Sequence, residues 1–495
     1  MAHHVDEYWK CFRTAAVAAL LPLLASCITD QATTPSPVAA ASTAAPVAEK
    51  PAEMAPATQR EHARILAAYG GAYSQPKLEA LLAQTVDRLV AASERPDLKY
   101  RVTILNSPAI NAFALSNGQL YVTRGLLALA SDTSEVASVL SHEMAHVIAR
   151  HAAFREDQAR QAEIFSRVAT DLLNDPQMGA LALARSKIAL ASFSRAQEFE
   201  ADGIGVGISA RAGFDPYGAQ RFLTAMGLNA QLKAPPSRNP DQRPPDFLSS
   251  HPSTPERIRN ARVNARQYVG PGVGRYEKDK TEYLALIDGL VYGDDPGDGY
   301  VRGRRFLHPK LGFTISAPEG FTLDNTSQAV FGIKDGGQQA LRLDVVSAPP
   351  DVNLAEYFNS EWLENIDKQS VSQITVNNLP AATATARNDE WTFRLYVVRL
   401  DTDVYRVIYA TRQPSDAADR SFRDSMNSFR RISAREAAAK PLRIKSVKVA
   451  PGATAESLAR RMAVPDRAVE RFRVLNGLAS GDKVKQGDYV KIVVE

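Results

Sequence analysis

Residues Val139–His151 read VLSHEMAHVIARH and contain three of the eight histidines in the chain. If this stretch is helical, His142 and His146 lie only ~40° apart around the helix axis, so both imidazoles point the same way. Two neutral imidazoles at this spacing can bind one Zn²⁺, and Glu143 at the edge of that face can take a proton from an activated water. The stretch therefore predicts two metal ligands and a general base.

A catalytic zinc site also needs a third protein ligand and one open position. HEMAH followed by SRAQEFEAD at residues 194–202 resembles the HtpX and CAAX-prenyl-endopeptidase superfamily of gluzincin zinc metallopeptidases. The resemblance implies one zinc per chain with Glu198 as the third ligand. It also implies that Asp202 accepts a hydrogen bond from a ligand histidine and orients it. Glu198 and Asp202 are four residues apart and share a helix face, which agrees with these roles.

Two further histidines have different predictions. His151 lies ~140° around a continuous helix from His146, so we expect it near the helix C-terminal dipole and not on the metal. His251, in SSHPSTPERI, lies in a segment that resembles a loop of the same superfamily. The resemblance implies that His251 reaches the zinc as a latch on the resting site, or that it stabilises the oxyanion. The alternative is a histidine that caps a turn. Arg195 is expected to pair with an acidic neighbour and shape the site.

The resemblance covers about residues 60–270. YGGAYSQPKLEALL and NAFALSNGQLYVTRGLL resemble segments that precede the zinc helix in the periplasmic, BepA-like branch, although Ser116 stands where relatives often have proline. No 34-residue helical repeat follows Tyr268, so the tetratricopeptide repeats of that branch are not expected here. The resemblance implies a mainly helical metallopeptidase domain with a small sheet.

The local patterns predict the elements that position these residues. YRVTIL is expected to form a strand, and Asn117-Gly118 is expected to form a type I′ turn between strands at 112–115 and 119–122. A helix should begin near Asp132, with Glu135 completing a capping box. Further helices are expected within 184–213 and at Glu256–Tyr268. GIGVG at 203–207 and GPGVG at 270–274 lack dinucleotide-loop spacing, so we expect close packing or turns. Helical stripes are formed by Leu78, Leu81, Leu82, Val86, Leu89 and Val90, and by Val136, Val139, Leu140 and Val147.

The N-terminus predicts export and lipidation. Lys10 and Arg13 precede a short apolar run that ends in LASC, so residues 1–26 are expected to be a signal peptide and Cys27 the lipidated residue. A plain secretory signal cleaved nearby is the alternative. Cys11 is the other cysteine, so the mature chain is expected to have no disulfide. An Asp directly after the lipidated cysteine resembles an inner-membrane retention signal. Residue 28 is Ile, and the absence of Asp favours the outer membrane. The periplasm-facing chain would then be held there by lipid.

The whole chain, 495 residues with a net charge of +4, is too long for one core and gives no indication of a nucleic-acid partner. We expect a multidomain α+β protein. After the signal peptide come a flexible tether at 27–58, the metallopeptidase domain at 59–275, a connecting segment at 276–299, an α+β domain of unknown role at 300–436 and a small module at 440–495.

The module at 440–495 is basic, with twelve Lys and Arg against six Asp and Glu. Its Pro451-Gly452 pair and its LNGL segment at 475–478 resemble a LysM module of β-α-α-β order, a family that binds N-acetylglucosamine-containing glycans such as peptidoglycan. Ala453 departs from the usual acidic residue. The basic surface could equally be a solvated face or meet anionic lipid or wall polymer.

The predicted function is a zinc endopeptidase of the bacterial cell envelope that cleaves unfolded or misassembled envelope proteins. An extended substrate would pair with the edge of the strand within 112–122, which requires local unfolding. The alternative is a peptidoglycan-binding or chaperone-like envelope lipoprotein whose protease site is latent or secondary.

Overall fold

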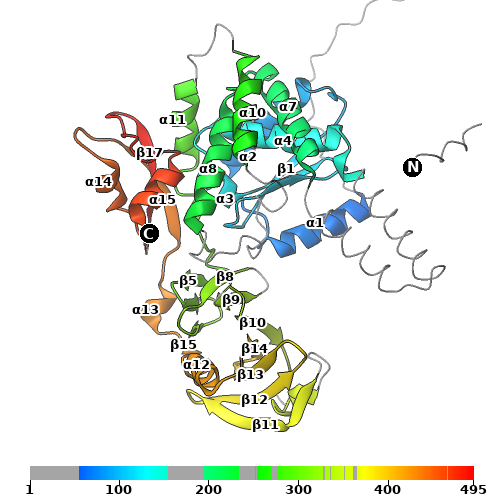
Figure 1. Ribbon diagram of the computed structural model, residues 1–495, viewed down its shortest axis with the longest axis vertical. Coiled ribbons are helices and arrows are strands. Elements are labelled where there is room, and N and C mark those ends of the chain that lie inside the picture. Colours follow the sequence, from blue (N-terminus) through cyan, green and yellow to red (C-terminus); the bar gives the residue numbers. More distant parts are fainter. Residues whose placement is uncertain are drawn as a thin grey trace, which may run out of the picture. The chain divides into compact units, whose positions relative to one another are not determined.

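A computed structural model describes residues 55–153, 193–233, 251, 254–269, 276–326, 329–334, 336–349, 352–359, 365–464 and 466–495. Residues Ala55–Glu495 form one compact unit (Figure 1). The expected signal peptide, Cys27, nearly all of the expected tether and the GPGVG segment lie outside the described residues. Among the described residues, no helix has the length and apolar character needed to cross a membrane.

A helix and a three-stranded sheet support one side of the predicted metal-binding helix. α2 (Pro76–Ala91) starts at a proline in its first turn. Of its predicted apolar stripe, Leu81 and Val90 are partly buried and the other four residues are buried. The sheet has the order β1-β3-β2, with β1 (Arg101–Leu105) parallel to β3 (Gln119–Thr123) and β2 (Ala112–Ala114) antiparallel to β3. β2 is therefore an edge strand of this sheet.

The hairpin between β2 and β3 is confirmed, but the predicted type I′ turn is wrong. Leu115 and Gln119 close a loop of three residues, because the Leu115 N–H donates to the Gln119 carbonyl over 2.8 Å. Gly118 has a φ of +82°, whereas Asn117 is not among the residues with positive φ. A type I′ turn needs two central residues with positive φ, so a three-residue loop with glycine in the left-handed position takes its place.

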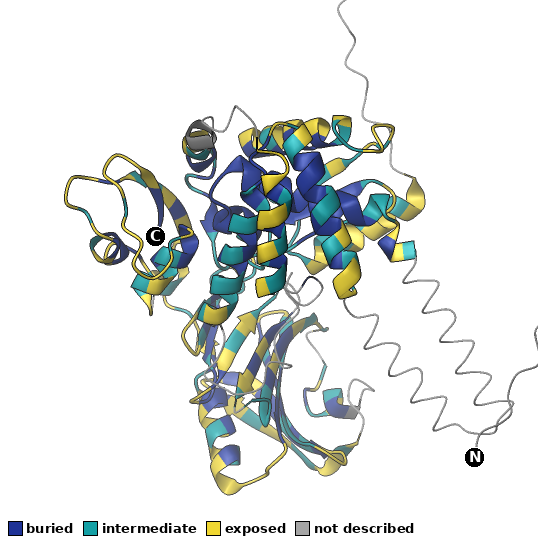
Figure 2. Cartoon of the chain, turned by 45° about the horizontal axis from the view of Figure 1, so that its top comes forward, coloured by how far each residue is buried: buried dark blue, intermediate teal, exposed yellow. Residues whose placement is uncertain are grey.

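The helix that carries HEMAH is buried on every side. α4 (Thr133–Ile148) begins after Asp132, whose side chain accepts the Glu135 N–H. The predicted capping box is only half formed, because Glu135 accepts from Ser131 N–H and not from Asp132 N–H. Burial extends beyond the predicted single stripe, since every residue from Thr133 to His146 is buried. Figure 2 shows buried helices, in dark blue, inside the helical part of the chain. Polar residues in this helix must therefore find partners inside the protein.

Two further helices pack against α4, and a third packs against those two. They are α7 (Arg195–Arg211), α8 (Gly218–Lys233) and α10 (Pro255–Arg266). α7 packs closest where Gly205 meets α4: a Cβ at this position would lie 3.0 Å from the His142 nitrogen and 3.1 Å from its Cα. The prediction that GIGVG serves close packing is confirmed for Gly205. α7 begins in a capping box formed by Ser194 and Gln197.

The expected connecting segment contributes to the core. It contains α11 (Tyr276–Leu286) and β4 (Val291–Tyr292). Tyr283, Leu284, Ile287 and Leu290 are fully buried. They belong to one hydrophobic cluster with side chains of α2, α4 and α8. Residues 276–292 are therefore part of the packed unit and not a linker alone.

Residues 440–495 have the β-α-α-β order that was predicted. β16 (Leu442–Lys448) and β17 (Tyr489–Val494) pair antiparallel, and α14 (Ala455–Ala459) and α15 (Ala468–Leu475) lie between them in sequence. β4 joins the same sheet beside β16. The buried side chains of this C-terminal segment belong to the same hydrophobic cluster as those of α4. This shared core was not predicted from the sequence.

Residues 300–436 form a mainly antiparallel β structure with a helix. The larger sheet has the order β11-β12-β13-β14-β10-β9-β8 and the smaller sheet has the order β15-β7-β6-β5. α12 (Asp416–Asn427) packs against the larger sheet through Phe422 and Met426. Phe358 of η3 (Glu356–Asn359) belongs to a separate apolar cluster with side chains of β12, β13 and β14. The expected α+β class is confirmed for this region. The strands are β5 (Tyr300–Arg302), β6 (Arg305–His308), β7 (Phe313–Ser316), β8 (Thr322–Asn325), β9 (Val330–Lys334), β10 (Gln339–Ser347), β11 (Ile366–Val376), β12 (Leu379–Arg387), β13 (Thr392–Leu400), β14 (Asp403–Thr411) and β15 (Arg430–Arg431).

Candidate metal centre

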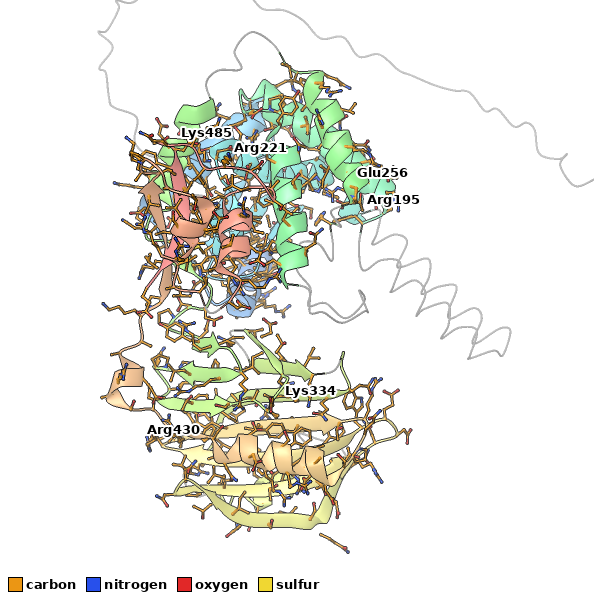
Figure 3. All side chains as sticks on the ribbon, turned by 60° about the vertical axis from the view of Figure 1, so that its left-hand side comes forward. Arg195, Arg221, Glu256, Lys334, Arg430 and Lys485 are labelled. Atoms are coloured by element: carbon orange, nitrogen blue, oxygen red, sulfur yellow. The ribbon has the colours of Figure 1, made fainter. Side chains whose placement is uncertain are left out.

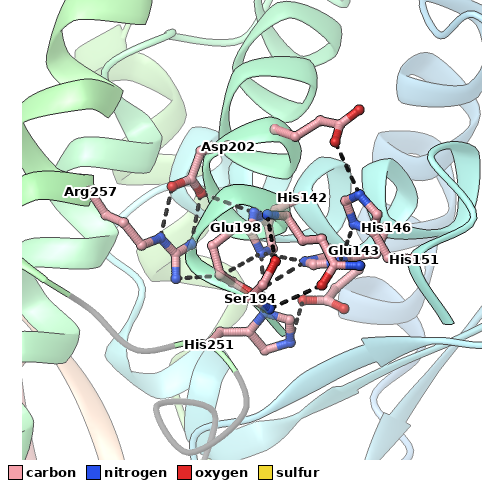
Figure 4. A network of polar contacts seen from close by, with 11 residues as sticks. His142, Glu143, His146, His151, Ser194, Glu198, Asp202, His251 and Arg257 are labelled. Atoms are coloured by element: carbon pink, nitrogen blue, oxygen red, sulfur yellow. Dashed lines mark hydrogen bonds and ion pairs between the residues drawn. The ribbon is translucent and has the colours of Figure 1, made fainter. Parts of the chain in front are cut away.

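The structure brings the predicted ligand residues together with His251. The Nε2 atoms of His142 and His146 are 3.1 Å apart, as their positions one turn apart on α4 require. Glu198 enters from the first turn of α7, and its carboxylate oxygens lie 3.6 Å from each of these nitrogens. His251 Nδ1 lies 3.3 Å from His142 Nε2 and 2.8 Å from Glu198 Oε1 (Figure 4). One donor atom from each residue fits within 4.8 Å of all the others, and all four residues are buried.

This donor set fits a tetrahedral cation in both size and chemistry. Ligand atoms ~2.0–2.1 Å from a tetrahedral Zn²⁺ stand ~3.3 Å from one another, close to the separations found here. Burial lowers the pKa of His142 and of His146, so both imidazoles are neutral and can offer a lone pair. Burial raises the pKa of Glu198, and a divalent cation among these donors would offset the cost of burying its carboxylate.

His142 is held in place by a carboxylate, as predicted. Its Nδ1 lies 3.0 Å from Asp202 Oδ1, one helical turn beyond Glu198 on α7. This contact leaves Nε2 to face the other donors, which is the usual arrangement for a metal-binding histidine. Burial alone would raise the pKa of Asp202, but hydrogen bonds from Arg257 and His142 outweigh it and hold the pKa at about 2.

Arg257, which was not predicted from the sequence, links Asp202 and Glu198. Its Nε and Nη2 bind both oxygens of Asp202 at 2.8 and 2.7 Å, and its Nη1 lies 2.6 Å from Glu198 Oε2. The sequence of α10 contains the pattern that could have revealed it, because Arg257, Ala261 and Ala265 recur every four residues and share one buried helix face. An arginine on a buried stripe needs a buried carboxylate, because an unpaired charge there would be too costly.

His151 is turned back toward the metal centre, so the predicted position at the end of a continuous helix is wrong. α4 ends at Ile148, and Arg150 adopts a left-handed φ of +56°. The change of direction buries His151 and places its Nδ1 2.9 Å from Nδ1 of His146. Its Nε2 lies 3.3 Å from Glu200. As predicted, His151 is not one of the four possible metal donors. It contacts the imidazole of His146, which is one of them, and holds it in place.

Glu143 lies beside the donors and outside their group. It is 3% exposed, and its pKa is raised well above the usual range by burial and by Glu198. A backbone N–H of Ala114, on β2, contributes a hydrogen bond that acts in the opposite direction. Among the described residues, Glu143 Oε1 has no hydrogen-bond partner, although His251 Nε2 lies 3.8 Å away. The free oxygen is suitable for accepting a proton from water.

Arg195 forms the predicted pair with an acidic neighbour, at the protein surface. Its Nη1 lies 3.5 Å from Glu256 Oε2, and both side chains are labelled side by side in Figure 3. The Arg195 side chain is 74% exposed. This ion pair joins the start of α7 to the start of α10, the two helices that carry Glu198 and Arg257.

Comparison with known proteins agrees with this geometry. Residues 76–265 match the profile described as Peptidase family M48. The beta-barrel assembly-enhancing protease of Escherichia coli strain K12 is 33% identical over 189 residues, which are 36% of this chain and 37% of that protein. The mitochondrial metalloendopeptidase OMA1 of Schizosaccharomyces pombe is 31% identical over 182 residues, 36% of this chain and 50% of that protein. The mitochondrial metalloendopeptidase OMA1 of Arabidopsis thaliana is 34% identical over 173 residues, which are 34% of this chain and 32% of that protein.

The profile match covers the part of the chain that holds the candidate metal centre. The chain spans 37% of the length of the E. coli relative. The residues that match include both helices of the site, from HEMAH on α4 to Glu198 and Asp202 on α7. The part of the chain that holds the candidate metal centre is therefore similar to Peptidase family M48.

Proposed function

We propose that the chain is a zinc-dependent endopeptidase of the bacterial cell envelope that cleaves unfolded or misassembled envelope proteins. The observation that carries the proposal is the buried group of His142, His146, Glu198 and His251, with Glu143 beside it. The match of residues 76–265 to Peptidase family M48 supports a peptidase activity. The relative from E. coli is named for assembly of β-barrel proteins, which supports envelope proteins as the substrates.

His142, His146 and Glu198 would hold the zinc ion, and each is fixed by a neighbour. Asp202 orients His142, His151 orients His146, and Arg257 holds the carboxylate of Glu198. The ion, when bound, supplies Lewis-acid activation of water and of the substrate carbonyl. Glu143 takes the proton of the attacking water and passes it to the leaving amine. Burial and the nearby Glu198 raise its pKa, which makes the carboxylate a stronger base.

The edge strand β2 supports an extended, locally unfolded substrate. β2 pairs with β3 on one side only, and the Ala114 N–H on its other side contacts Glu143. A substrate strand that pairs with this edge would therefore lie next to the general base. Pairing of this kind uses main-chain hydrogen bonds, which a folded substrate has already used within its own structure. This requirement favours proteins that have failed to fold or assemble.

His251 is proposed to act as a latch on the resting site. With His251 in place, four protein donors surround one point, whereas catalytic zinc sites keep one position open for water. Movement of His251 would open that position. His251→Ala should then raise the basal rate of cleavage of an unfolded protein such as casein. An inactive variant that still binds zinc would instead support the role in stabilising the oxyanion.

The general-base proposal is tested by Glu143→Gln, which keeps the size and hydrogen bonding of the side chain. We expect metal content equal to wild type and cleavage of casein reduced by about 10²-fold or more. Glu282→Gln, at an exposed glutamate of α11, is the matched control. Cleavage by Glu143→Gln at the wild-type rate with metal bound would refute the role. The same variant, recovered from envelopes, should retain bound substrate proteins for identification.

The ligand set is tested by metal analysis of Glu198→Ala and of wild type. Zinc should be present in wild type, and Glu198→Ala should lose most of it. Wild type without zinc, or Glu198→Ala with undiminished zinc, would contradict the assignment.

We also propose that the chain is held at the outer membrane through lipid on Cys27. The proposal rests on the LASC sequence and on Ile28. Cys27→Ser should abolish incorporation of labelled fatty acid and release the protein from the membrane fraction. Continued membrane association of Cys27→Ser would favour another mode of attachment.

The second candidate function is recognition of wall glycan by residues 440–495. The β-α-α-β order with antiparallel strands supports a LysM-like module. The full chain should then sediment with insoluble peptidoglycan, and soluble N-acetylglucosamine oligomers should compete for binding. Binding that the oligomers do not reduce, but salt does, would indicate charge attraction by the basic surface.

A further inference from the structure

The C-terminal segment inserts a lysine into the peptidase domain. Lys491, on β17, is fully buried, and its Nζ donates hydrogen bonds to three successive carbonyls. The acceptors are Ala128 at 2.9 Å, Leu129 at 2.8 Å and Ala130 at 2.6 Å. An ammonium group has three N–H donors, so this set of acceptors satisfies it completely. Burial lowers the pKa of Lys491, and the Glu135 carboxylate opposes that shift.

These carbonyls lie at the end of α3 (Arg124–Leu129), where a helix cannot satisfy them itself. The preceding carbonyl, of Leu127, accepts from the buried hydroxyl of Tyr283 on α11 over 2.6 Å. The C-terminal end of α3 is therefore completed by Tyr283 and Lys491. Both residues lie outside the 76–265 region that matches family M48.

The N-cap of α4, the helix that carries HEMAH, lies two residues after the last of these carbonyls. Asp132 is the N-cap of α4, and Ser131 N–H donates to Glu135 in its first turn over 2.9 Å. Arg221, on α8, contacts Asp132 at 2.8 Å and Glu135 at 3.3 Å. The corner from Ala128 to Glu135 is thus fixed on one side by the C-terminal segment and on the other by α8.

Lys491 is itself held rigidly in its strand. Its backbone N–H donates to Asn476 Oδ1 over 2.7 Å, and its carbonyl accepts from Asn476 Nδ2 over 2.9 Å. Asn476 is buried at the end of α15. The lysine can therefore transmit a fixed position from the C-terminal segment to the corner before α4.

We propose that Lys491 is a positioning residue for the metal centre, acting through the α3–α4 corner to set where α4 presents His142 and His146 relative to Glu198. Glu198 comes from α7, so the separation of these donors depends on the placement of the two helices. The proposal rests on the proposed function of the same residues as a metal site. It assigns to residues 440–495 a role in building the peptidase that does not depend on glycan binding.

The test uses the full-length protein with Lys491→Met, which keeps a long side chain but removes the charge and the donors. Lys485→Met, at an exposed lysine in the loop before β17, is the matched control (Figure 3). Cobalt(II) replaces zinc, because its visible spectrum reports ligand geometry. Cobalt affinity is measured by competition with a chelator. We expect Lys491→Met to show an altered spectrum and about tenfold weaker binding, at the lower end of the losses seen for groups that support ligands. Lys485→Met should match wild type.

A milder variant covers the case in which Lys491→Met does not fold. Tyr283→Phe removes one hydroxyl from the same end of α3, and Tyr489→Phe, at an exposed tyrosine of β17, is its control. Tyr283→Phe should change the cobalt spectrum in the same direction and by less. A folded Lys491→Met with the wild-type spectrum and affinity would overturn the proposal. If Lys491→Met does not fold, an unchanged Tyr283→Phe would overturn it. If wild type binds cobalt but cleaves no unfolded protein, the proposed function fails while this test still gives its answer.

Discussion

Gly205→Ala should separate the two helices that carry the predicted ligands. The added Cβ would lie 3.0 Å from the His142 nitrogen, 3.1 Å from its Cα and 3.2 Å from the Ser141 carbonyl carbon, whereas ordinary Cβ contacts lie at 3.4–4 Å. All three atoms belong to the α4 backbone, so no side chain can rotate away. α4 and α7 must move apart by a few tenths of an ångström. Glu198, two turns earlier on α7, moves with them.

The magnitude follows from two opposing effects. Overpacking of this kind costs about 1–3 kcal/mol. Replacing glycine by alanine inside a helix stabilises it by about 1 kcal/mol. The net change in the free energy of unfolding is therefore a loss of about 0–2 kcal/mol. Gly203→Ala provides the matched control on the same helix, because its nearest neighbour is a side-chain atom of Asn264 at 3.8 Å. That variant should gain about 0.5–1 kcal/mol, since only the helix propensity changes.

Thermal unfolding of the metal-free proteins should rank Gly203→Ala above wild type and Gly205→Ala below Gly203→Ala. Zinc affinity should fall in Gly205→Ala and stay unchanged in Gly203→Ala, because only the first variant displaces His142 from Glu198. If the two variants had equal melting temperatures and equal zinc affinity, the close approach of the helices would not set the metal centre. The reasoning from Gly205 would then be wrong.

Three other predictions concern His151, Arg257 and His308. His151→Ala should weaken zinc binding about 10–100-fold, because His146 loses the partner of its Nδ1, and His151→Asn should recover part of the affinity. If chelator competition gave equal zinc affinity for wild type and both variants, His151 would not orient His146. Arg257→Met should lower the free energy of unfolding of the metal-free protein by about 3–5 kcal/mol, because Asp202 and Glu198 lose their buried counterion. Calorimetry should show a smaller loss when zinc is bound. Burial lowers the pKa of His308 from 6.5 to about 4, so the unfolded chain binds more protons than the folded chain between these pH values. The free energy of unfolding should therefore fall by up to about 3 kcal/mol as the pH drops from 6.5 to 4. Denaturant unfolding of His308→Asn should show a weaker dependence on pH than that of wild type.

The part of the metal centre that is local in sequence could be predicted from spacing alone. His142 and His146 are one turn apart, so a helix brings their nitrogens together regardless of the rest of the fold. Glu198 could not be found this way, because its approach depends on how α7 packs on α4, and the resemblance to a known family provided it. Arg257 was within reach of the sequence, since it continues the stripe of Ala261 and Ala265 on α10.

The errors arose where the chain departs from regular geometry or where distant segments meet. His151 was placed on a continuous helix, but the left-handed Arg150 ends the helix and turns His151 inward. The turn at Asn117-Gly118 was expected to have two central residues, but Leu115 pairs with Gln119 and leaves three. Lys491 is more than 360 positions from the carbonyls that it binds, and its strand has an ordinary apolar pattern. No local signal distinguishes it from an exposed lysine.

The shared core changes how the C-terminal segment must be studied. A LysM-like module that was merely attached could be deleted to test wall binding, with the peptidase left intact. Here the deletion of residues 440–495 would expose the apolar side chains that Phe472, Ile492 and Val493 cover, and it would leave the carbonyls of Ala128 to Ala130 without Lys491. Buried carbonyls without partners each cost about 1–3 kcal/mol, so the peptidase domain would be destabilised directly. We expect such a truncation to lose zinc and protease activity whether or not the module binds glycan. Charge reversal at the exposed Lys483 and Lys485 leaves the core in place, so a loss of wall binding in that variant, with protease activity retained, would separate the two functions.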